Sequence, residues 1–199
     1  SQMVQIGEKF TAEELWKIAL IGSSNNALSA LVRVSGLNIE DFVFKMNEKA
    51  KSFRLHSLTF DEPTGLSNKN RGNAKDITRL LKVALQQEKI YSTLQTPEYY
   101  VISSETKKQR RVWNTNWLLT RWIPSNFNQE QVVGKTGYIG DSGYNFVARF
   151  EISGKKAVRV LVLGAASNEA RFTEARDLAI WGFNNYLWPE DEGYGELVE

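Results

Sequence analysis

The sequence predicts an α+β fold, in which helices come first, an antiparallel sheet follows and a last helix covers it. The 199 residues first place apolar side chains at helical spacing, up to about residue 87. After Pro97 the pattern changes to short runs rich in β-branched and aromatic residues, separated by turn residues. A second helical run extends from about residue 169 to 187. Because helices and strands are segregated rather than alternating, the α+β class is favoured over a parallel α/β fold.

Capping residues mark the helix starts in the first half of the chain. Thr11 and Glu14 form a capping box, which predicts the start of a helix that Gly22 ends. Asn38 and Asn73 are expected to cap two later helices, since their side-chain oxygens can accept hydrogen bonds from free backbone N–H groups. The four helices are expected at about residues 12–21, 26–35, 39–53 and 74–87.

The second half contains the predicted sheet. Five strands are expected at about residues 99–102, 112–119, 131–136, 144–152 and 157–163. The first two strands form a hairpin, and Ser153-Gly154-Lys155 is a tight turn between the last two. Residues 1–188 are expected to belong to one domain, and residues 189–199 form an acidic C-terminal tail without a core pattern.

Composition excludes several classes of function. A 199-residue chain with 42% hydrophobic residues can bury a core of one domain. Its net charge of +2 gives no electrostatic argument for nucleic acid, and the basic run from Lys107 to Arg111 is expected to be a solvated face. The chain has no cysteine, which excludes disulfides, zinc thiolate sites and thiol catalysis. No apolar run approaches the roughly eighteen residues of a membrane span.

A K-T-G tripeptide, Lys135-Thr136-Gly137, stands at the end of a predicted strand and is followed by Tyr138. On a strand, K-T-G is one of three signatures of the serine penicillin-binding and β-lactamase enzymes, together with S-x-N and an S-x-x-K nucleophile. So short a pattern also arises by chance, and its context decides whether it carries function.

Two overlapping S-x-N patterns follow the first helix. They are Ser23 with Asn25 and Ser24 with Asn26. The first pair is favoured, because it leaves Asn26 to open the next helix, where asparagine is a good N-terminal residue.

Both motifs stand inside a longer match, which runs through GEKFTAEELWKIALIGSSNNALSAL, MNEKAKSFRLHSLTFDEPTGL, WNTNWLL, KTGYIGDSGYNFVARF and VLVLGAASNEARFTEARDLAIWGF. On these segments the chain from Gly7 to Tyr186 resembles the low-molecular-mass D-alanyl-D-alanine carboxypeptidases, the S11 serine peptidases. The resemblance implies a penicillin-binding and β-lactamase-like transpeptidase fold, with an antiparallel five-stranded sheet flanked by helices on both faces. It also implies that Trp117 and Trp181 are core residues.

The same resemblance implies an activity: removal of the terminal D-alanine from peptidoglycan stem peptides through an acyl-enzyme. It further implies binding of β-lactams, no metal or other cofactor, and a location outside the bacterial cytoplasmic membrane. Ser23 would relay a proton to the leaving amine, and Lys135 would assist that relay. The residues implied in substrate binding are Asn25, Thr136, Gly137, Tyr138 through its backbone amide, and Arg171.

Two of these assignments have alternatives that the sequence leaves open. Asn25 could satisfy its own backbone in a helix turn instead of binding a substrate amide. Arg171 could be an exposed arginine in the first turn of the last helix instead of the ligand of a terminal carboxylate. The positive end of the helix dipole repels a cation at a helix N-terminus, so an exposed arginine there would not stabilise the helix.

The nucleophile of the family is not recognised in this chain. Family members carry S-x-x-K some tens of residues before S-x-N. Ser104-Glu105-Thr106-Lys107 has the pattern but lies after S-x-N in a cluster of cations, which cannot desolvate a lysine, so a solvated turn is expected there.

The chain is therefore expected to be a partial catalytic domain, without its N-terminal strands and nucleophile helix, and inactive alone. The alternative is a catalytically inert peptidoglycan-binding or scaffold module of the same fold. A β-lactamase is less favoured, because no second carboxylate is placed to activate water. An incomplete fold would also leave an apolar groove open to water, which favours self-association.

Overall fold

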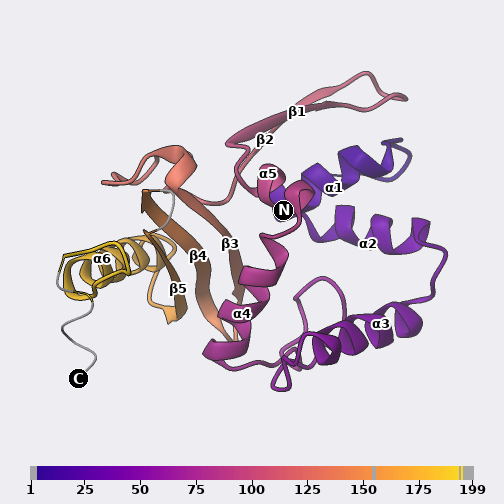
Figure 1. The fold of residues 1–199 in the computed structure, drawn as a ribbon. Helices are drawn as coiled ribbons and strands as arrows, with labels where there is room; N and C mark the ends of the chain where they lie inside the picture. Colours follow the sequence, from indigo (N-terminus) through magenta and orange to yellow (C-terminus); the bar gives the residue numbers. More distant parts are fainter. Residues whose placement is uncertain (1–3, 154–155, 193, 195–199) are drawn as a thin grey trace.

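The computed structural model describes residues 4–153, 156–192 and 194, and it has a helical part beside a sheet part (Figure 1). The helices are α1 (Ala12–Ile21), α2 (Asn25–Val34), α3 (Ile39–Ser52), α4 (Ala74–Ala84), α5 (Glu88–Leu94) and α6 (Ala170–Asn185), with a 3₁₀ turn, η1, at Gln129–Gln131. The strands are β1 (Glu98–Ile102), β2 (Gln109–Trp113), β3 (Val132–Ile139), β4 (Gly143–Ser153) and β5 (Lys156–Ala165). The predicted α+β class is confirmed.

The capping residues act as predicted. Thr11 accepts a hydrogen bond from the Glu14 backbone at 3.1 Å, and the Glu14 carboxylate accepts one from the Thr11 N–H at 2.7 Å. Asn38 and Asn73 each accept a 2.8 Å bond from the backbone N–H three residues on. These local bonds explain why the helix starts could be found without tertiary information.

Two helix boundaries differ from the prediction. The second helix begins at Asn25, one residue early, after Ser24 as its N-terminal cap residue. The helix expected at residues 74–87 ends at Ala84, and a separate helix, α5, begins at Glu88. Neither glycine nor proline marks that break in the sequence, so the apolar spacing predicted one helix that continued through it.

The strands form two separate antiparallel sheets rather than one. β1 pairs with β2, and the larger sheet has the order β3-β4-β5. β3 continues through the K-T-G tripeptide to Ile139 and is longer than predicted, as are β4 and β5. The predicted turn at residues 153–155 falls partly on residues 154 and 155, which lie outside the described residues.

The strand predicted at residues 112–119 ends at Trp113, and this prediction was wrong beyond that point. The side chain of Asn114 donates to the carbonyls of Leu94 and Thr96 at 3.0 and 2.9 Å. Asn116 accepts from the N–H groups of Leu118 and Leu119 at 3.2 and 3.4 Å. These asparagine side chains stabilise a buried turn, which the apolar alternation of the segment did not reveal.

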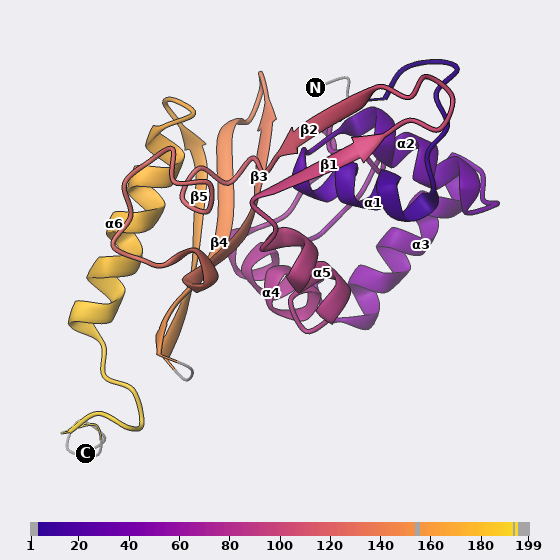
Figure 2. The same ribbon diagram turned by 90° about the horizontal axis from the view of Figure 1, so that it is seen from above.

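Helices cover both faces of the larger sheet, as Figure 2 shows for α6 on one side and α4 on the other. The main core lies between the sheet and α6 and contains Phe146, Phe150 and Phe172, all fully buried. Trp117 packs against this core as expected. Trp181 is 51% exposed, so its predicted core position was wrong.

A second core lies under the β1–β2 hairpin, which runs along α1 (Figure 2). Ile18 and Ile21 of α1 meet Val101 of β1 and Val112 of β2 there. None of the described helices has the length and apolar character needed to cross a membrane.

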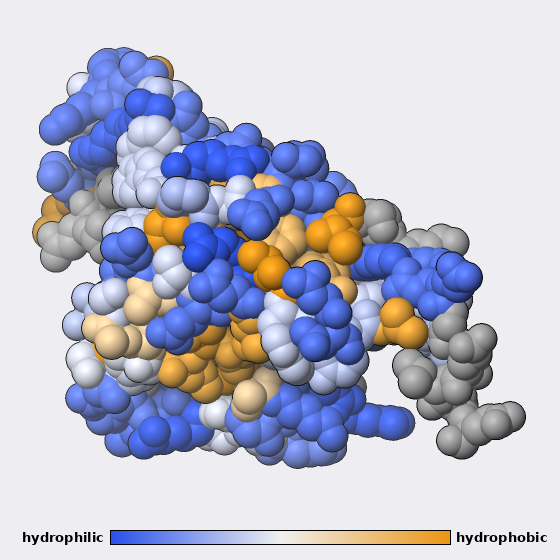
Figure 3. Space-filling view, turned by 90° about the vertical axis from the view of Figure 1, so that its left-hand side faces the viewer, coloured by the Kyte–Doolittle hydropathy of each residue, from blue (hydrophilic) through white to orange (hydrophobic). Residues whose placement is uncertain are grey.

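One edge of the larger sheet carries exposed apolar side chains. Within the described residues β5 pairs only with β4. Leu163 on β5 and Leu178 on α6 are 53% and 47% exposed. Figure 3 shows apolar side chains gathered on the face where β5 and α6 lie. The expected apolar groove, and self-association through it, stay predictions.

Candidate active site

A tight turn between α1 and α2 positions the predicted catalytic serine. Gly22 ends α1, and a Cβ added there would lie 2.7 Å from a methyl group of Val112, so glycine is required by packing. Ser23 follows with φ of +50°, a left-handed conformation that costs energy for a residue other than glycine. Such strain at a serine often marks a functional position.

Lys135 on β3 meets this serine across 112 positions of sequence. Its Nζ donates to the Oγ of Ser23 at 2.6 Å and to the carbonyl of Thr136 at 3.1 Å. Burial, together with the positive charge of Arg171, lowers the pKa of Lys135 to about 8. A lysine that titrates near neutral pH can both give and take a proton during catalysis.

The two S-x-N patterns have different surroundings. Ser24 is 1% exposed and donates to Asn26 at 2.6 Å, and Asn26 donates to the carbonyl of Val4 at 2.5 Å. Asn25 is half-buried in the first turn of α2, and no side-chain hydrogen bond of Asn25 is found in the described part of the chain. Ser24 and Asn26 therefore bind their own fold, whereas Ser23 meets Lys135.

Thr136 and Gly137, the other two K-T-G residues, lie in the second half of β3, and Tyr138 follows them. Thr136 is 9% exposed, and its Oγ1 lies 2.7 Å from the Oγ1 of Thr115. A Cβ on Gly137 would meet only Asn145, at an ordinary 3.8 Å, so the fold itself does not need glycine there. Tyr138 is 56% exposed with its ring 4.5 Å from that of Tyr144. Among the described strands only β4 pairs with β3, so the other edge of β3 has no strand partner there.

Arg171 is buried, so the alternative of an exposed arginine was wrong. Its side chain is 6% exposed at the start of α6, and Nη1 donates to the carbonyls of Gly137 and Asn145 at 3.1 and 3.4 Å. Its Nε is buried without a partner. Burial lowers the pKa of Arg171 to about 10, which still leaves the guanidinium charged at neutral pH. The structure thus brings a fixed positive charge beside the K-T-G strand.

Neither S-x-x-K tetrapeptide of the chain lies at this site. Ser104 and Lys107 are exposed at the tip of the β1–β2 hairpin, where a solvated turn was expected. A second tetrapeptide, from Ser153 to Lys156, was missed in the sequence. These two residues pair at the end of the β4–β5 hairpin, six positions beyond Val147, the partner of Lys135. That separation is about 20 Å along the strand.

Sequence reasoning also missed Thr115, whose hydroxyl meets Thr136. It lies between Asn114 and Asn116, and its N–H donates to the carbonyl of Ile21 at 3.1 Å, so it joins the α1–α2 turn to β3. Two asparagines inside an apolar run were the available signal. Such residues are buried only when their polar groups are bonded.

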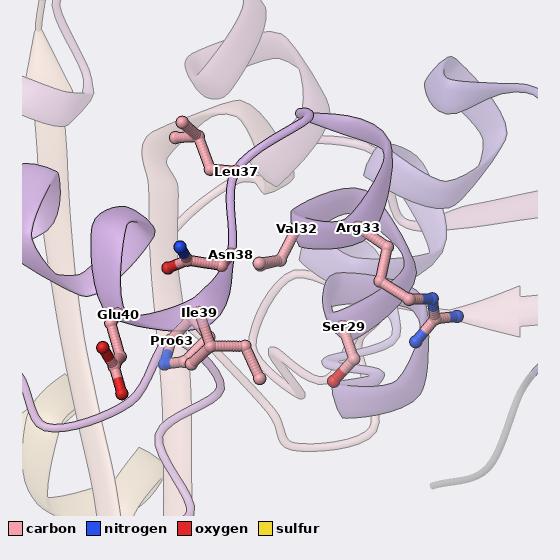
Figure 4. A pocket seen from close by; sticks show the side chains of 8 residues that line it. All are labelled: Ser29, Val32, Arg33, Leu37, Asn38, Ile39, Glu40 and Pro63. Atoms are coloured by element: carbon pink, nitrogen blue, oxygen red, sulfur yellow. The ribbon is translucent and has the colours of Figure 1, made fainter.

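Two cavities differ in their relation to these residues. The larger, about 650 Å³, lies between α2 and α3 (Figure 4), and no predicted site residue lines it. A smaller one, about 330 Å³, is lined by Gly22, Thr115 and Arg171 together with three tryptophans. The smaller cavity therefore adjoins the lysine–serine pair, whereas the larger cavity does not.

A fold with K-T-G on a sheet strand facing S-x-N defines the class of serine penicillin-binding enzymes and β-lactamases. The sequence model of the D-alanyl-D-alanine carboxypeptidase family, peptidase family S11, matches residues 1–167. The chain belongs to this family.

Several known proteins are similar. A D-alanyl-D-alanine endopeptidase of Haemophilus influenzae is 34% identical over 69% of this chain and 44% of its own length. The D-alanyl-D-alanine carboxypeptidase DacF of Bacillus subtilis is 32% identical over 90% of this chain and 44% of its own length. The Streptomyces K15 DD-transpeptidase shares the fold with a TM-score of 0.79 and 24% identity, over 92% of this chain and 72% of that one. The chain spans about half the length of the curated relatives it matches.

Proposed function

We propose that the chain is the part of a serine-type D-Ala-D-Ala carboxypeptidase that relays the proton and binds the substrate. The observation that carries this proposal is the 2.6 Å hydrogen bond from Lys135 to Ser23, with a lysine whose pKa is about 8. In such a pair Ser23 gives its hydroxyl proton to the leaving amine while Lys135 gives one to the Oγ of Ser23. The serine is thereby restored, and the lysine is left with one proton fewer.

The chemistry of the whole reaction is acyl transfer. An acylating serine adds to the penultimate D-alanine carbonyl, the peptide C–N bond breaks as the amine is protonated, and water then hydrolyses the ester. The residues of this chain would carry out the proton transfers of that reaction. The acylating serine would have to come from elsewhere in a longer protein, because neither S-x-x-K tetrapeptide lies at the site.

The substrate would lie along the open edge of β3. A peptide that adds to the edge of β3 needs space beside Gly137. The packing of the fold does not itself require a glycine there, since a Cβ would make only an ordinary contact, so the absence of a side chain would serve to make room for the peptide. The backbone amide of Tyr138 would donate to the developing oxyanion, an interaction typically worth about 3 kcal/mol. Asn25 would bind the substrate amide, and Thr136 and Arg171 would bind its terminal carboxylate. The unpaired Nε of Arg171 supports that last role.

Partners and location follow from this substrate. We propose peptidoglycan stem peptides as substrates, β-lactams as acylating ligands of the longer protein, and a place outside the cytoplasmic membrane, where stem peptides are found. The α-helical and sheet parts together, residues 1–188, would form one partial catalytic domain with the tail at 189–199.

The second candidate is an inert binding module of the same fold. It is favoured by the exposed position of Ser104 and Lys107, which denies this chain an obvious nucleophile. The two proposals differ in the sequence that precedes Ser1 in the reading frame: an S-x-x-K there supports the enzyme, and its absence supports the module.

Incubation of this chain with benzylpenicillin followed by intact-mass spectrometry tests the assignment of roles. We expect no stoichiometric mass increase, because the chain contributes no activated serine of its own. An adduct that maps to Ser104 would show that the hairpin tip acylates and would overturn the assignment. An adduct on Ser23 would make that serine the nucleophile instead of the relay.

A further inference from the structure

The turn between β3 and β4 is joined to the helical part by a contact that the proposed roles do not use. Nδ2 of Asn68 donates to Oδ2 of Asp141 at 2.6 Å, across 73 positions of sequence. Both residues are exposed, and Asp141 lies two positions after Ile139, where β3 ends. No ion pair of Asp141 is found in the described residues, so its carboxylate is available to a cationic group of a ligand.

The segment that carries Asn68 is fixed around another carboxylate. Glu62 accepts hydrogen bonds from the backbone N–H groups of Thr64 and Gly65 at 2.7 and 2.6 Å. Burial opposes these bonds, and the net effect lowers the pKa of Glu62 to about 2, so this carboxylate is charged at neutral pH. A segment fixed in this way can hold Asp141 in one position before a ligand arrives, which reduces the entropy lost on binding.

The proposed function, on which this inference rests, fixes the direction of a peptide along β3. The terminal carboxylate of the peptide would lie at Thr136 and Arg171, and its scissile carbonyl at the backbone amide of Tyr138. A step towards the N-terminus of the peptide is then a step towards the C-terminal end of β3, so the two are antiparallel. The residue that precedes D-Ala-D-Ala would therefore lie opposite Ile139.

The side chain of that preceding residue would lie on the face of β3 that meets the helical part. Ile139 is four positions after Lys135, so both side chains are on the face where Lys135 bonds to Ser23. Residues directly opposite each other on antiparallel strands share a face. An L-residue opposite Ile139 would thus extend its side chain on the face where Asn68 holds Asp141, about two residues or 7 Å further along the chain.

We propose that Asp141, positioned by Asn68, is a specificity-determining residue that selects a basic side chain in the residue before D-Ala-D-Ala. The group it binds is an ammonium at the end of a flexible stem, as in a diamino acid, because such a stem can extend from the peptide backbone to the turn. The ammonium donates to Oδ1 of Asp141, since Oδ2 already accepts from Asn68. The site therefore prefers stem peptides whose diamino acid keeps its side-chain amine free.

Two peptides that differ by one charge test this with the chain itself, by NMR titration of its backbone amides. One is Nα-acetyl-L-Lys-D-Ala-D-Ala, and the other carries a second acetyl group on the lysine side chain. Both offer the same terminal carboxylate to Arg171. We expect the peptide with the free amine to bind about two- to fivefold more tightly, the scale of one exposed ion pair. In about 1 M salt, which screens such a pair, the two affinities should become nearly equal.

Variants assign the preference to the turn. Asp141→Asn should bring the ratio of the two dissociation constants close to one, and Asp141→Lys should invert it. Asn68→Ala should lower the ratio only in part, because the carboxylate is still present but is no longer fixed. Asp41→Asn is the matched control and should leave the ratio unchanged, since Asp41 is also exposed and its Oδ2 also accepts from an asparagine, Asn38, at 2.9 Å, at the start of α3.

The outcomes separate the inference from the proposed function. Equal affinity for the two peptides in low salt, with shifted amides at Gly137 and Tyr138 in both titrations, would overturn the inference and leave the proposed function intact. A preference that persists unchanged in Asp141→Asn and Asp141→Lys would overturn its assignment to Asp141. The spectra also report whether each variant is folded, and two substitutions at one position keep the test usable should one of them unfold. Failure of both peptides to shift the amides of β3 would overturn the proposed function, and the inference with it.

Discussion

Two of the serine–lysine pairs in the chain have opposite surroundings. Ser23 and Lys135 are 112 positions apart in sequence, yet they share a 2.6 Å hydrogen bond in a partly buried site. Ser104 and Lys107 are three positions apart and exposed at a hairpin tip, where Ser104 donates to the carbonyl of Lys9 at 3.3 Å. Ser104 and Lys107 thus have the spacing of a catalytic tetrapeptide but do not lie at the site.

The difference teaches that burial, rather than closeness in sequence, prepares a lysine for proton transfer. Taking Lys135 out of water penalises its charged form, which is why its pKa falls to about 8. At the hairpin tip the charges are instead matched with charges of the N-terminal segment, as in the ion pairs of Lys9 with Glu105 and of Arg110 with Glu8. The Arg110 guanidinium holds the pKa of Glu8 below its usual value. These contacts attach the hairpin to the fold.

The largest expected effect comes from removing the lysine of the buried pair. In a longer protein that contains this chain and an acylating serine, Lys135→Ala should slow acylation by benzylpenicillin by roughly two to three powers of ten, the scale for one preorganised electrostatic group. Lys107→Ala is the matched control and should leave the rate unchanged. A Lys135→Ala protein that acylates at the parental rate would show that the K-T-G lysine is not part of the site.

The next effect concerns the carboxylate. Arg171→Ala in the same longer protein should lower kcat/KM for a peptide with a free C-terminal carboxylate by roughly 2–4 kcal/mol. A C-terminally amidated peptide should lose much less, since it never offered the charge. Arg176→Ala, also on α6 but bonded to the carbonyl of Pro124, is the control. Equal losses on both substrates would mean that Arg171 only stabilises the fold, through its bonds with the carbonyls of Gly137 and Asn145, and does not bind the carboxylate.

A smaller effect is expected on stability as the pH changes. The pKa of Lys135 is about 8 in the folded chain and about 10.4 when unfolded, so the unfolded state holds more protons between these values. The free energy of unfolding should therefore rise from about pH 8 to about pH 10 relative to Lys135→Met, by on the order of 1–3 kcal/mol. Urea unfolding of both proteins at several pH values measures this, and a difference that stays constant or falls would refute the linkage.

The smallest effects belong to the exposed pair. Ser104→Ala and Lys107→Ala should each change the free energy of unfolding by no more than about 0.5 kcal/mol, as is usual for exposed side chains with few contacts. Thermal unfolding followed by circular dichroism is sufficient to check this. A loss of several kcal/mol from either variant would mean that the hairpin tip contributes more to the fold than its exposure suggests.

The features that sequence could predict are those fixed by neighbouring residues. The caps at Thr11, Asn38 and Asn73 depend on residues three positions away, and all three are confirmed. The K-T-G strand and the closing helix were also found, because their apolar periodicity is local. The buried turn that the sequence did not predict depends on distant partners, because the side chain of Asn114 bonds to the carbonyls of Leu94 and Thr96, about twenty positions away.

The candidate site shows the same division. Motif spacing selected Ser23 and Lys135, but only the fold brings them together. The burial of Arg171 could not be read from the sequence, since its partners are carbonyls on β3 and β4, 34 and 26 positions away. Thr115 had no motif of its own and is placed by its bond to Thr136. Residue types can therefore be chosen from sequence, whereas their electrostatic state is set by tertiary packing.

The most direct test of the claim that burial prepares the lysine is an NMR titration of the Lys135 side chain, assigned by comparison with Lys135→Ala. We expect a midpoint near pH 8, caused by burial beside Ser23 and Arg171. A midpoint near about 10.4, the value of a freely solvated lysine, would contradict the claim, because a lysine so strongly basic could not share its proton with Ser23 at neutral pH.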